Sequence, residues 1–288
     1  MTVGERPTLR ARRGAEILRG HVASPEVDAR LLLSHVLQCR PGDLVAAGTA
    51  TPAQEQRYAE LLQIRASGVP LQHLTGEAWF RGVRVEVGPG VFIPRPETES
   101  VAGAAIERAG RLRSVGRMPL VVELCAGSGA ISAALLDEVP GCRVVAVERD
   151  AAAVRWCRRN LAGTTAEVRH EDMAEAAHDL DGRVDVVVVN PPYVPLAVRD
   201  DLPREVTLHD PEAAVFSGQD GLEAIVVVEE VARRLLRPGG LVVCEHDDTH
   251  GTSAPAIFRG LAWTDVADHR DLSGRPRWVT GTRSEVAG

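Results

Sequence analysis

The sequence contains no lysine, because all 33 of its basic residues are arginine. It therefore has no lysine to grip a phosphate in a P-loop, to form a Schiff base or to act as a general base. Acidic residues outnumber basic ones, and the formal net charge is −7. This charge argues against a large basic face for nucleic acid, so we expect no direct nucleic-acid partner.

Aromatic residues and long apolar runs are also scarce. Aromatics make up 3% and hydrophobic residues 44% of the 288 residues, which predicts one large or two modest domains with an aliphatic core. No run of about 18 apolar residues is present to span a membrane, and the first residues contain no apolar signal-peptide stretch. We expect a cytoplasmic protein that acts as a monomer and has no membrane partner.

The five cysteines are dispersed and never spaced C-x-x-C. This pattern disfavours a disulfide framework or a zinc knuckle and predicts buried free thiols. His246 and His250 lie close together beside acidic residues, but they follow a predicted strand and no regular helix is expected to pair them. We therefore predict no metal site.

Residues 1–75 are predicted to form a helical bundle. One helix is expected over Leu9–Leu18, a second is predicted to start with Ser24 as its N-cap, and a third starts at the capping box Thr51-Pro52-Ala53-Gln54. Valines that alternate with Arg84 and Glu86 predict a β-hairpin linker over residues 76–96. Residues 97–288 are expected to form the second, larger domain.

Strands and helices alternate from Leu120 onward. Repeated βα units of this kind predict a doubly wound α/β sheet, mostly parallel, with helices on both faces. We expect strands at 120–124, 143–147, 167–170, 184–189 and 241–244 and near Trp263 and Trp278, with helices at 97–113, 130–138, 151–161 and 221–236.

The segment Val184–Tyr193 reads V-D-V-V-V-V-N-P-P-Y. Its β-branched run predicts a strand covered on both faces in the middle of a parallel sheet. Pro191 and Pro192 have no backbone N–H and restrict φ, so Asn190 and Tyr193 are held on a stiff loop at the carboxyl end of that strand. Open α/β sheets bind their ligands at this edge.

Asn190 and the prolyl carbonyl beside it offer two hydrogen-bond acceptors for a planar –NH2 group. The nitrogen of such a group is a poor nucleophile, so it must be held in line with a strong electrophile. An asparagine alone is also a common turn residue. A chain turn alone does not readily explain two rigid prolines between two side chains that can recognise a substrate. We therefore interpret the tetrapeptide N-P-P-Y as a substrate clamp.

A second ligand-binding turn, E-L-C-A-G-S-G-A, begins at Glu123 and joins a predicted strand to a helix. Gly127 and Gly129 allow the backbone to approach a ligand closely, and the helix N-terminus directs N–H groups toward it. Glu148 ends the next strand, where a carboxylate can accept hydrogen bonds from both ribose hydroxyls. Asp172 follows the third strand and can accept one from an adenine amino group.

The nucleotide at this turn is predicted to be S-adenosylmethionine. A dinucleotide fingerprint needs a third glycine where this chain has Ser132, and Glu123 would repel a pyrophosphate. The same carboxylate suits a ligand that carries a sulfonium and an amino-acid tail but no phosphate. S-adenosylmethionine therefore fits better than NAD.

Three motifs resemble one family over nearly the whole chain. They are I-P-R-P-E-T-E from Ile93, E-L-C-A-G-S-G-A-I from Glu123 and N-P-P-Y-V-P from Asn190. Together they are similar to the protein-glutamine N5-methyltransferases of peptide-chain release factors, the HemK/PrmC family. N-P-P-Y alone is shared with amino-adenine methyltransferases, whereas the P-R-P-E-T-E segment with T-G-E at Thr75 is more particular.

The resemblance implies a fold and a reaction. The fold is that of a class I S-adenosylmethionine-dependent methyltransferase, with a Rossmann-like, seven-stranded, mostly parallel sheet and an N-terminal helical bundle that recognises the substrate. The reaction is methyl transfer to the side-chain amide of the glutamine in the Gly-Gly-Gln motif of a release factor, which would be the protein partner.

The resemblance also assigns roles to particular residues. Asn190 and the Pro191 carbonyl would accept from the substrate amide, and Tyr193 would pack on the glutamine side chain, with Pro192, Arg95 and Glu97 also lining the substrate site. Cofactor contacts would fall on Glu123, Cys125, Ala126, Gly127, Ser128, Gly129, Glu148, Asp172, Met173 and Asn190.

The chain departs from the family pattern outside the clamp. Glu123 stands where aspartate is commoner, Asp210 replaces a glutamate, and Asp247 and His250 replace a glycine and a glutamine. These departures bear on substrate fit more than on reaction type. Two other functions stay open. One is an N6-adenine methyltransferase acting on DNA or RNA, and the other is a non-catalytic module that binds S-adenosylmethionine.

Overall fold

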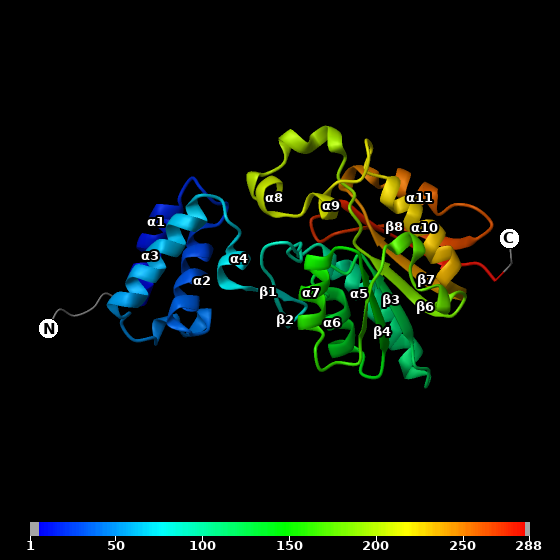
Figure 1. Cartoon of the computed structure of the whole chain (residues 1–288), viewed down its shortest axis with the longest axis horizontal. Helices are drawn as coiled ribbons and strands as arrows, with labels where there is room; N and C mark the ends of the chain where they lie inside the picture. Colours follow the sequence, from blue (N-terminus) through cyan, green and yellow to red (C-terminus); the bar gives the residue numbers. More distant parts are fainter. Residues whose placement is uncertain (1–5, 286–288) are drawn as a thin grey trace. The chain divides into compact units, whose positions relative to one another are not determined.

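The computed structural model describes residues 6–285. The chain divides into two compact units (Figure 1). The helical unit comprises the chain up to Glu77 together with Pro203–His209, and the α/β unit comprises Ala78–Leu202 and the chain from Asp210 onward. Among the described residues, no helix is long and apolar enough to cross a membrane.

Proline starts most of the helices in the helical unit. Pro7, Pro25, Pro41 and Pro52 each occupy the first turn of a helix, where the missing backbone N–H would have no intrahelical partner in any case. The elements are α1 (Pro7–Leu18), α2 (Pro25–Leu37), the 3-10 helix η1 (Pro41–Val45), α3 (Pro52–Ala66), α4 (Leu71–Thr75) and α8 (Arg204–His209).

One of the two predicted helix caps is present. Thr51 Oγ1 accepts from the Gln54 backbone N–H at 3.3 Å, and Gln54 Oε1 accepts from the Thr51 backbone N–H at 2.9 Å, which confirms the capping box of α3. The prediction that Ser24 caps α2 is wrong, because its side chain makes no capping hydrogen bond. Its backbone ψ of 67° departs from the extended geometry of a capping residue.

A buried arginine joins the two stretches of chain that form the helical unit. Arg65 is 7% exposed and donates to the carboxylate of Asp28 at 2.7 Å and to that of Glu205 at 3.2 Å. Glu205 belongs to α8, so a half-buried ion pair joins this segment to the helical unit. Breaking the buried Arg65–Asp28 pair would leave an uncompensated buried charge, which costs about 3–5 kcal/mol.

The α/β unit begins with the hairpin of β1 (Glu77–Phe80) and β2 (Val83–Glu86), in the predicted linker region. Its other strands are β3 (Leu120–Leu124), β4 (Arg143–Glu148), β5 (Glu167–His170), β6 (Val184–Val189), β7 (Leu236–Glu245), β8 (Trp263–Arg270) and β9 (Pro276–Arg283). Its helices are α5 (Thr98–Ser114), α6 (Ala130–Glu138), α7 (Ala151–Asn160), α9 (Glu212–Val215), α10 (Glu223–Leu235) and α11 (Ser253–Ile257), with short 3-10 turns η2 (Met173–Glu175), η3 (His178–Leu180), η4 (Leu196–Asp201) and η5 (Asp248–His250).

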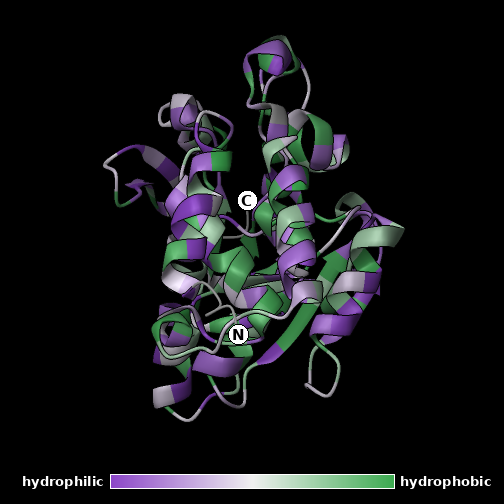
Figure 2. Ribbon diagram, turned by 90° about the vertical axis from the view of Figure 1, so that its left-hand side faces the viewer, coloured by the Kyte–Doolittle hydropathy of each residue, from purple (hydrophilic) through white to green (hydrophobic). Residues whose placement is uncertain are grey.

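Seven strands form one sheet in the order β5-β4-β3-β6-β7-β9-β8. The five strands from β5 to β7 pair in parallel, and β9 pairs antiparallel with both β7 and β8. Side chains of β3 and β6 alternate between two cores, one under α5 and α6 and one under α10. The helices are banded purple and green in Figure 2, as expected for elements with one buried side. The predicted fold class is confirmed.

Every residue of the central strand β6 is buried, as its β-branched run predicts. The exception to its apolar sequence is Asp185, which is 4% exposed. Its carboxylate accepts from Arg117 at 3.0 Å, from Arg237 at 2.5 Å and from the Leu120 backbone N–H at 2.9 Å. These bonds compensate the buried charge at the end of β6 opposite Asn190.

The sequence predicted most strand and helix boundaries to within two residues. The largest difference lies at residues 237–240, which fall between the expected helix at 221–236 and the expected strand at 241–244 but belong to β7. The pairing register of β6 with β7 shifts between Val184 and Val186, so this segment enters the sheet through an irregularity. Proline and glycine at such a point are typical of a bulge as well as of a helix end.

All five cysteines are free thiols, as predicted, but the expected burial holds for only three of them. Cys142, Cys157 and Cys244 are buried, whereas Cys39 and Cys125 are half-buried. Burial raises the pKa of Cys142 to about 12, so this thiol stays protonated at neutral pH.

Candidate active site

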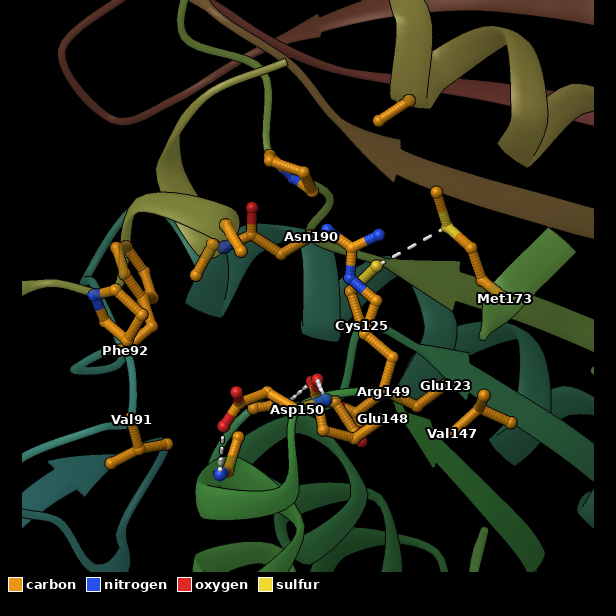
Figure 3. A pocket seen from close by; sticks show the side chains of 18 of the residues that line it. Val91, Phe92, Glu123, Cys125, Val147, Glu148, Arg149, Asp150, Met173 and Asn190 are labelled. Carbon is orange, nitrogen blue, oxygen red and sulfur yellow. Dashed lines mark hydrogen bonds between the residues drawn. The ribbon is translucent and has the colours of Figure 1, made fainter. Parts of the chain in front are cut away.

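A cavity of about 370 Å³ lies at the carboxyl ends of the parallel strands in the α/β unit. Its volume is in the range of small-molecule sites. In Figure 3, Asn190 lies apart from Glu148 and Asp150, with Phe92 and Met173 farther to either side. Nine of the ten predicted cofactor residues line it, whereas Gly129 does not; the nine are Glu123, Cys125, Ala126, Gly127, Ser128, Glu148, Asp172, Met173 and Asn190.

The two glycines of the loop after β3 have different surroundings. Gly127 has φ +55°, lines the cavity, and has open space where a Cβ would be. Gly129 has φ +78°, and a Cβ there would lie 3.0 Å from the Cys157 Sγ of α7. Gly127 therefore leaves room for a ligand, whereas Gly129 is required for packing of the loop against α7. Cys125 also has a positive φ, +54°, without being a glycine.

Glu148 holds the same loop. Its Oε2 accepts from the Gly127 backbone N–H at 2.8 Å, and its Oε1 accepts from the Asp150 backbone N–H at 2.8 Å. A carboxylate oxygen has about two acceptor positions, so each oxygen keeps one for a further donor. A pair of vicinal hydroxyls on a ribose matches this remaining capacity.

Glu123 is a buried carboxyl at the end of β3. It is 2% exposed and accepts hydrogen bonds from the backbone N–H and the hydroxyl of Ser132 in α6. Burial raises its pKa to about 8, and the charge of Glu148 adds to the rise, while the bonds from Ser132 oppose it. Ser132, which occupies the position of a third fingerprint glycine, thus acts as the partner of this carboxyl.

A sulfur contact forms another wall of the cavity. Cys125 Sγ lies 3.5 Å from Met173 Sδ, as the dashed line in Figure 3 shows. Beside them, Asp172 accepts from the Ala174 backbone N–H at 3.0 Å and pairs with Arg149 at 3.5 Å. This combination of an apolar surface and a half-exposed carboxylate suits a planar base that carries an amino group.

The side-chain amide of Asn190 is oriented by Thr98. Asn190 Nδ2 donates to Thr98 Oγ1 at 3.1 Å, and Thr98 is the first residue of α5 and 4% exposed. Because the amide nitrogen is engaged, the Oδ1 atom is left as the acceptor for a ligand in the cavity. This is the geometry that a clamp for an –NH2 group requires.

Tyr193 makes a second contact with the sheet. Its hydroxyl donates to Glu245 Oε1, at the end of β7, at 2.9 Å. Burial keeps the pKa of Tyr193 well above its ordinary value, so the hydroxyl remains a donor. Pro192 lines the cavity, whereas Pro191 is buried and neither it nor Tyr193 is part of the lining.

Arg95 and Glu97 do not line the cavity. Arg95 pairs with the buried carboxylate of Asp210 at 2.6 Å and stacks over the ring of Phe92. Glu97 is exposed at the start of α5. The Arg95 pair joins the P-R-P-E-T-E segment to the loop after the clamp.

Sequence reasoning missed several residues that line the cavity. Phe92, Pro94 and Thr98 come from the region of the P-R-P-E-T-E motif, where the resemblance assigns only Arg95 and Glu97 to the substrate site. A larger group lies in the loop and helix beyond the clamp, namely Pro211, Ala213, Ala214, Phe216, Ser217, Gly218, Glu223, Ala224 and Val227. Small and apolar residues of this kind carry no local pattern that marks them as part of a site.

The two neighbouring histidines have separate partners. His246 Nε2 contacts Asp268 Oδ1 at 3.0 Å and its Nδ1 contacts the Asp247 carbonyl at 2.8 Å, whereas His250 Nε2 contacts the Asp220 carbonyl at 2.9 Å. Burial lowers the pKa of His246. Within residues 6–285 no group of three or more His, Cys, Asp or Glu side chains is placed to hold a metal ion.

The fold and the site together define a class of protein. Residues 112–207 match the family described as "Methyltransferase small domain". Among solved structures, the catalytic domain of hMettl16 in complex with the MAT2A 3'UTR hairpin 6 superposes with a TM-score of 0.55 at 13% identity, covering 79% of this chain and 83% of that one. At this identity the likeness shows the fold alone. The chain is a class I methyltransferase that uses S-adenosylmethionine.

The particular family follows from closer relatives. Residues 11–76 match the "PrmC N-terminal domain". Proteins named "Release factor glutamine methyltransferase" are 48% identical in Streptomyces coelicolor, over 91% of this chain and 92% of that one, and 42% identical in Mycolicibacterium smegmatis, over 93% and 94%. A "4-amino-L-phenylalanine/4-methylamino-L-phenylalanine methyltransferase" of Streptomyces pristinaespiralis is 42% identical over 83% and 82%. The chain belongs to the release factor glutamine methyltransferase family, as its motifs predicted.

Proposed function

We propose that this chain methylates the side-chain amide nitrogen of the glutamine in the Gly-Gly-Gln motif of a peptide-chain release factor. The observation that carries the proposal is the orientation of Asn190, whose Nδ2 donates to Thr98 at 3.1 Å. Asn190 lines a cavity with the dimensions of a small-molecule site, and this bond leaves its Oδ1 as an acceptor. The names of the relatives over more than nine-tenths of the chain support a release factor as the substrate.

The cavity suits S-adenosylmethionine. Glu148 keeps acceptor capacity for the ribose hydroxyls, and Gly127 leaves open space beside them. Asp172 and Met173 offer a carboxylate and an apolar surface for the adenine, and the buried carboxyl of Glu123 suits the positive charge of the amino-acid tail. The bound cofactor supplies an electrophilic methyl group.

In this proposal the chain's own residues orient the substrate amide. Asn190 Oδ1 accepts one N–H of the glutamine amide, the Pro191 carbonyl accepts the other, and Tyr193 packs on the glutamine side chain. These contacts hold the nitrogen in line with the methyl group, so that the two reactants need not meet by diffusion. In well-oriented systems this effect lowers the activation barrier by about 7–11 kcal/mol. Each aimed acceptor adds roughly 3 kcal/mol as positive charge grows on the nitrogen.

The helical unit is proposed to recognise the release factor. Residues 1–75 form the substrate-recognition domain in this scheme, 76–96 the linker and 97–288 the methyltransferase domain. The enzyme acts as a monomer in the cytoplasm, where the proposed substrate functions in translation, and it needs neither nucleic acid nor membrane. Because one relative is named for an aryl amine substrate, small amines belong among the acceptors that a test must include.

The test is a transfer assay with S-adenosylmethionine labelled in its methyl group. Four acceptors are offered in parallel, namely a release factor, its Gly-Gly-Ala variant, 4-amino-L-phenylalanine and unmethylated DNA. Label on the wild-type factor but not on the variant supports the proposal. Label on the free amino acid or on DNA moves the chain to a small-amine or adenine methyltransferase, and no transfer despite cofactor binding favours a binding module.

A further inference from the structure

Glu245 is a buried carboxyl that the proposed reaction does not yet use. It ends β7 and is 1% exposed. Its Oε1 accepts from the Tyr193 hydroxyl at 2.9 Å. Its Oε2 is buried, and the hydroxyl of Thr98 acts on the same carboxyl. Burying an ionisable carboxyl away from water is costly, which suggests that this one is retained for a purpose other than stability.

Groups from several elements act on the charge of this carboxyl. They are Tyr193 of the clamp, Thr98 and Glu97 at the start of α5, Arg277 of β9 and the adjacent Cys244. Burial raises the pKa of Glu245 to about 7, and the charge of Glu97 acts in the same direction. The hydroxyls of Thr98 and Tyr193 and the charge of Arg277 lower it. The carboxyl therefore changes its charge close to neutral pH.

The charge of Glu245 decides which way the neighbouring hydroxyls donate. An ionised carboxylate can only accept, so Tyr193 and Thr98 both direct their O–H groups toward it. The lone pairs of Thr98 Oγ1 are then free for Asn190 Nδ2, and Asn190 Oδ1 faces the substrate. A protonated carboxyl donates to Thr98 instead. The Thr98 hydroxyl is then free to donate to Asn190 Oδ1, and the amide turns its nitrogen toward the cavity.

We propose that Glu245 is a positioning residue that acts through Thr98 and Tyr193 to keep the Asn190 amide oxygen and the Tyr193 ring in the orientation for methyl transfer. The inference rests on the proposed function, because it names what fixes the clamp. The orientation for methyl transfer requires the ionised form of Glu245. Activity therefore rises with pH as this carboxyl loses its proton, and the substrate amide has no titration of its own in this range.

The test compares wild-type protein with Glu245→Gln, which keeps the size of the side chain and removes the titration. The acceptor is a release factor, and S-adenosylmethionine is saturating so that titration of Glu123 in the cofactor site does not contribute. We expect wild-type kcat/KM to rise about tenfold per pH unit below an apparent pKa near 7. The Glu245→Gln variant is expected to be about tenfold slower at pH 8, with KM within about twofold and no rise with pH.

Two further variants separate positioning from folding. Thr98→Val removes only the hydroxyl and should give the same flat profile, whereas Thr98→Ser should restore the wild-type profile. Glu107→Gln changes an exposed carboxyl of the same helix and should leave the profile unchanged. If Glu245→Gln or Thr98→Val keeps the wild-type rate and pH dependence, the proposal is wrong.

A measurement without substrate keeps this inference distinct from the proposed function. In protein labelled with 15N in its asparagine side chains, the Asn190 amide resonance should shift with pH through a midpoint near 7. The same resonance in Glu245→Gln should stay constant over that range. A constant resonance in the wild-type protein would refute the role of Glu245, whereas failure of wild-type protein to methylate a release factor would refute only the proposed substrate.

Discussion

Replacing Glu123 by glutamine tests the electrostatics of the cofactor site directly. The wild-type carboxyl is 2% exposed, and its pKa rises from the ordinary 4.5 to about 8. The two pKa values differ by about 3.5, and each unit is worth about 1.4 kcal/mol. Titration of Glu123 can therefore change the free energy of unfolding by about 5 kcal/mol at most. The glutamine keeps an oxygen that can accept from the Ser132 backbone N–H, but it carries no charge. The part of the pH dependence of stability that Glu123 causes should therefore disappear in the variant.

The sign of the effect follows from the direction of the pKa change. An acid with a raised pKa in the folded state binds its proton more tightly there than in the unfolded chain. Its contribution to stability is complete below about pH 4.5 and is lost as the pH rises through 8. Most groups that titrate in the same range are shared by the two proteins and cancel in their difference.

The assay is urea denaturation of the ligand-free proteins at pH 5, 6, 7 and 8. We expect Glu123→Gln to gain stability relative to wild type by about 1 kcal/mol for each pH unit in this range. Calorimetry should also show wild-type binding of S-adenosylmethionine tightening by about fivefold or more from pH 6.5 to 8.5, with little change in the variant. A stability difference that stays constant with pH would refute the reasoning.

Three further predictions concern the clamp, the glycine loop and the helical unit. Asn190→Ala should lower single-turnover methyl transfer by about a hundredfold or more while the cofactor Kd, measured by calorimetry, stays within about tenfold; a wild-type rate would contradict the clamp. Gly129→Ala should lower the free energy of unfolding by about 1–3 kcal/mol, because its Cβ would lie 3.0 Å from Cys157 Sγ at a φ of +78°. Gly127→Ala should instead weaken cofactor binding more than it lowers stability. If the two changes affected stability and cofactor binding equally, the separate roles of the two glycines would be contradicted. Thr51→Ala should cost about 1 kcal/mol in urea denaturation through loss of the capping box, and no change would mean that the cap is not stabilising.

The relative named for 4-amino-L-phenylalanine limits what the clamp alone can specify. An aryl amine and a glutamine amide both present a planar –NH2 group with a delocalised lone pair. If the proposed clamp holds the substrate nitrogen, the same acceptors would serve both, and the choice of substrate would rest on groups farther from the nitrogen. The loop residues from Pro211 to Gly218, several of which line the cavity, are candidates for that choice.

The fold class, and the edge of the sheet where the chemistry lies, can be predicted from local sequence patterns. Apolar alternation and β-branched runs locate the strands, and parallel strands joined by helices end on the same edge. Glu123, Glu148 and Asn190 each stand at or just beyond a strand end, which predicts that they meet at this edge, and all three line one cavity. The capping box at Thr51 could also be predicted from the sequence, because its two hydrogen bonds join residues that lie within four consecutive positions.

How these groups are held depends on contacts between segments that are distant in the sequence. Asn190 and its partner Thr98 are 92 residues apart in the sequence, and Tyr193 and Glu245 are 52 apart. Pairings at such separations depend on how helices and strands pack, and no local periodicity encodes them. For the same reason the sequence could not tell that Gly129 serves packing while Gly127 faces the cavity, because both occupy the left-handed region and differ only in what a Cβ would meet.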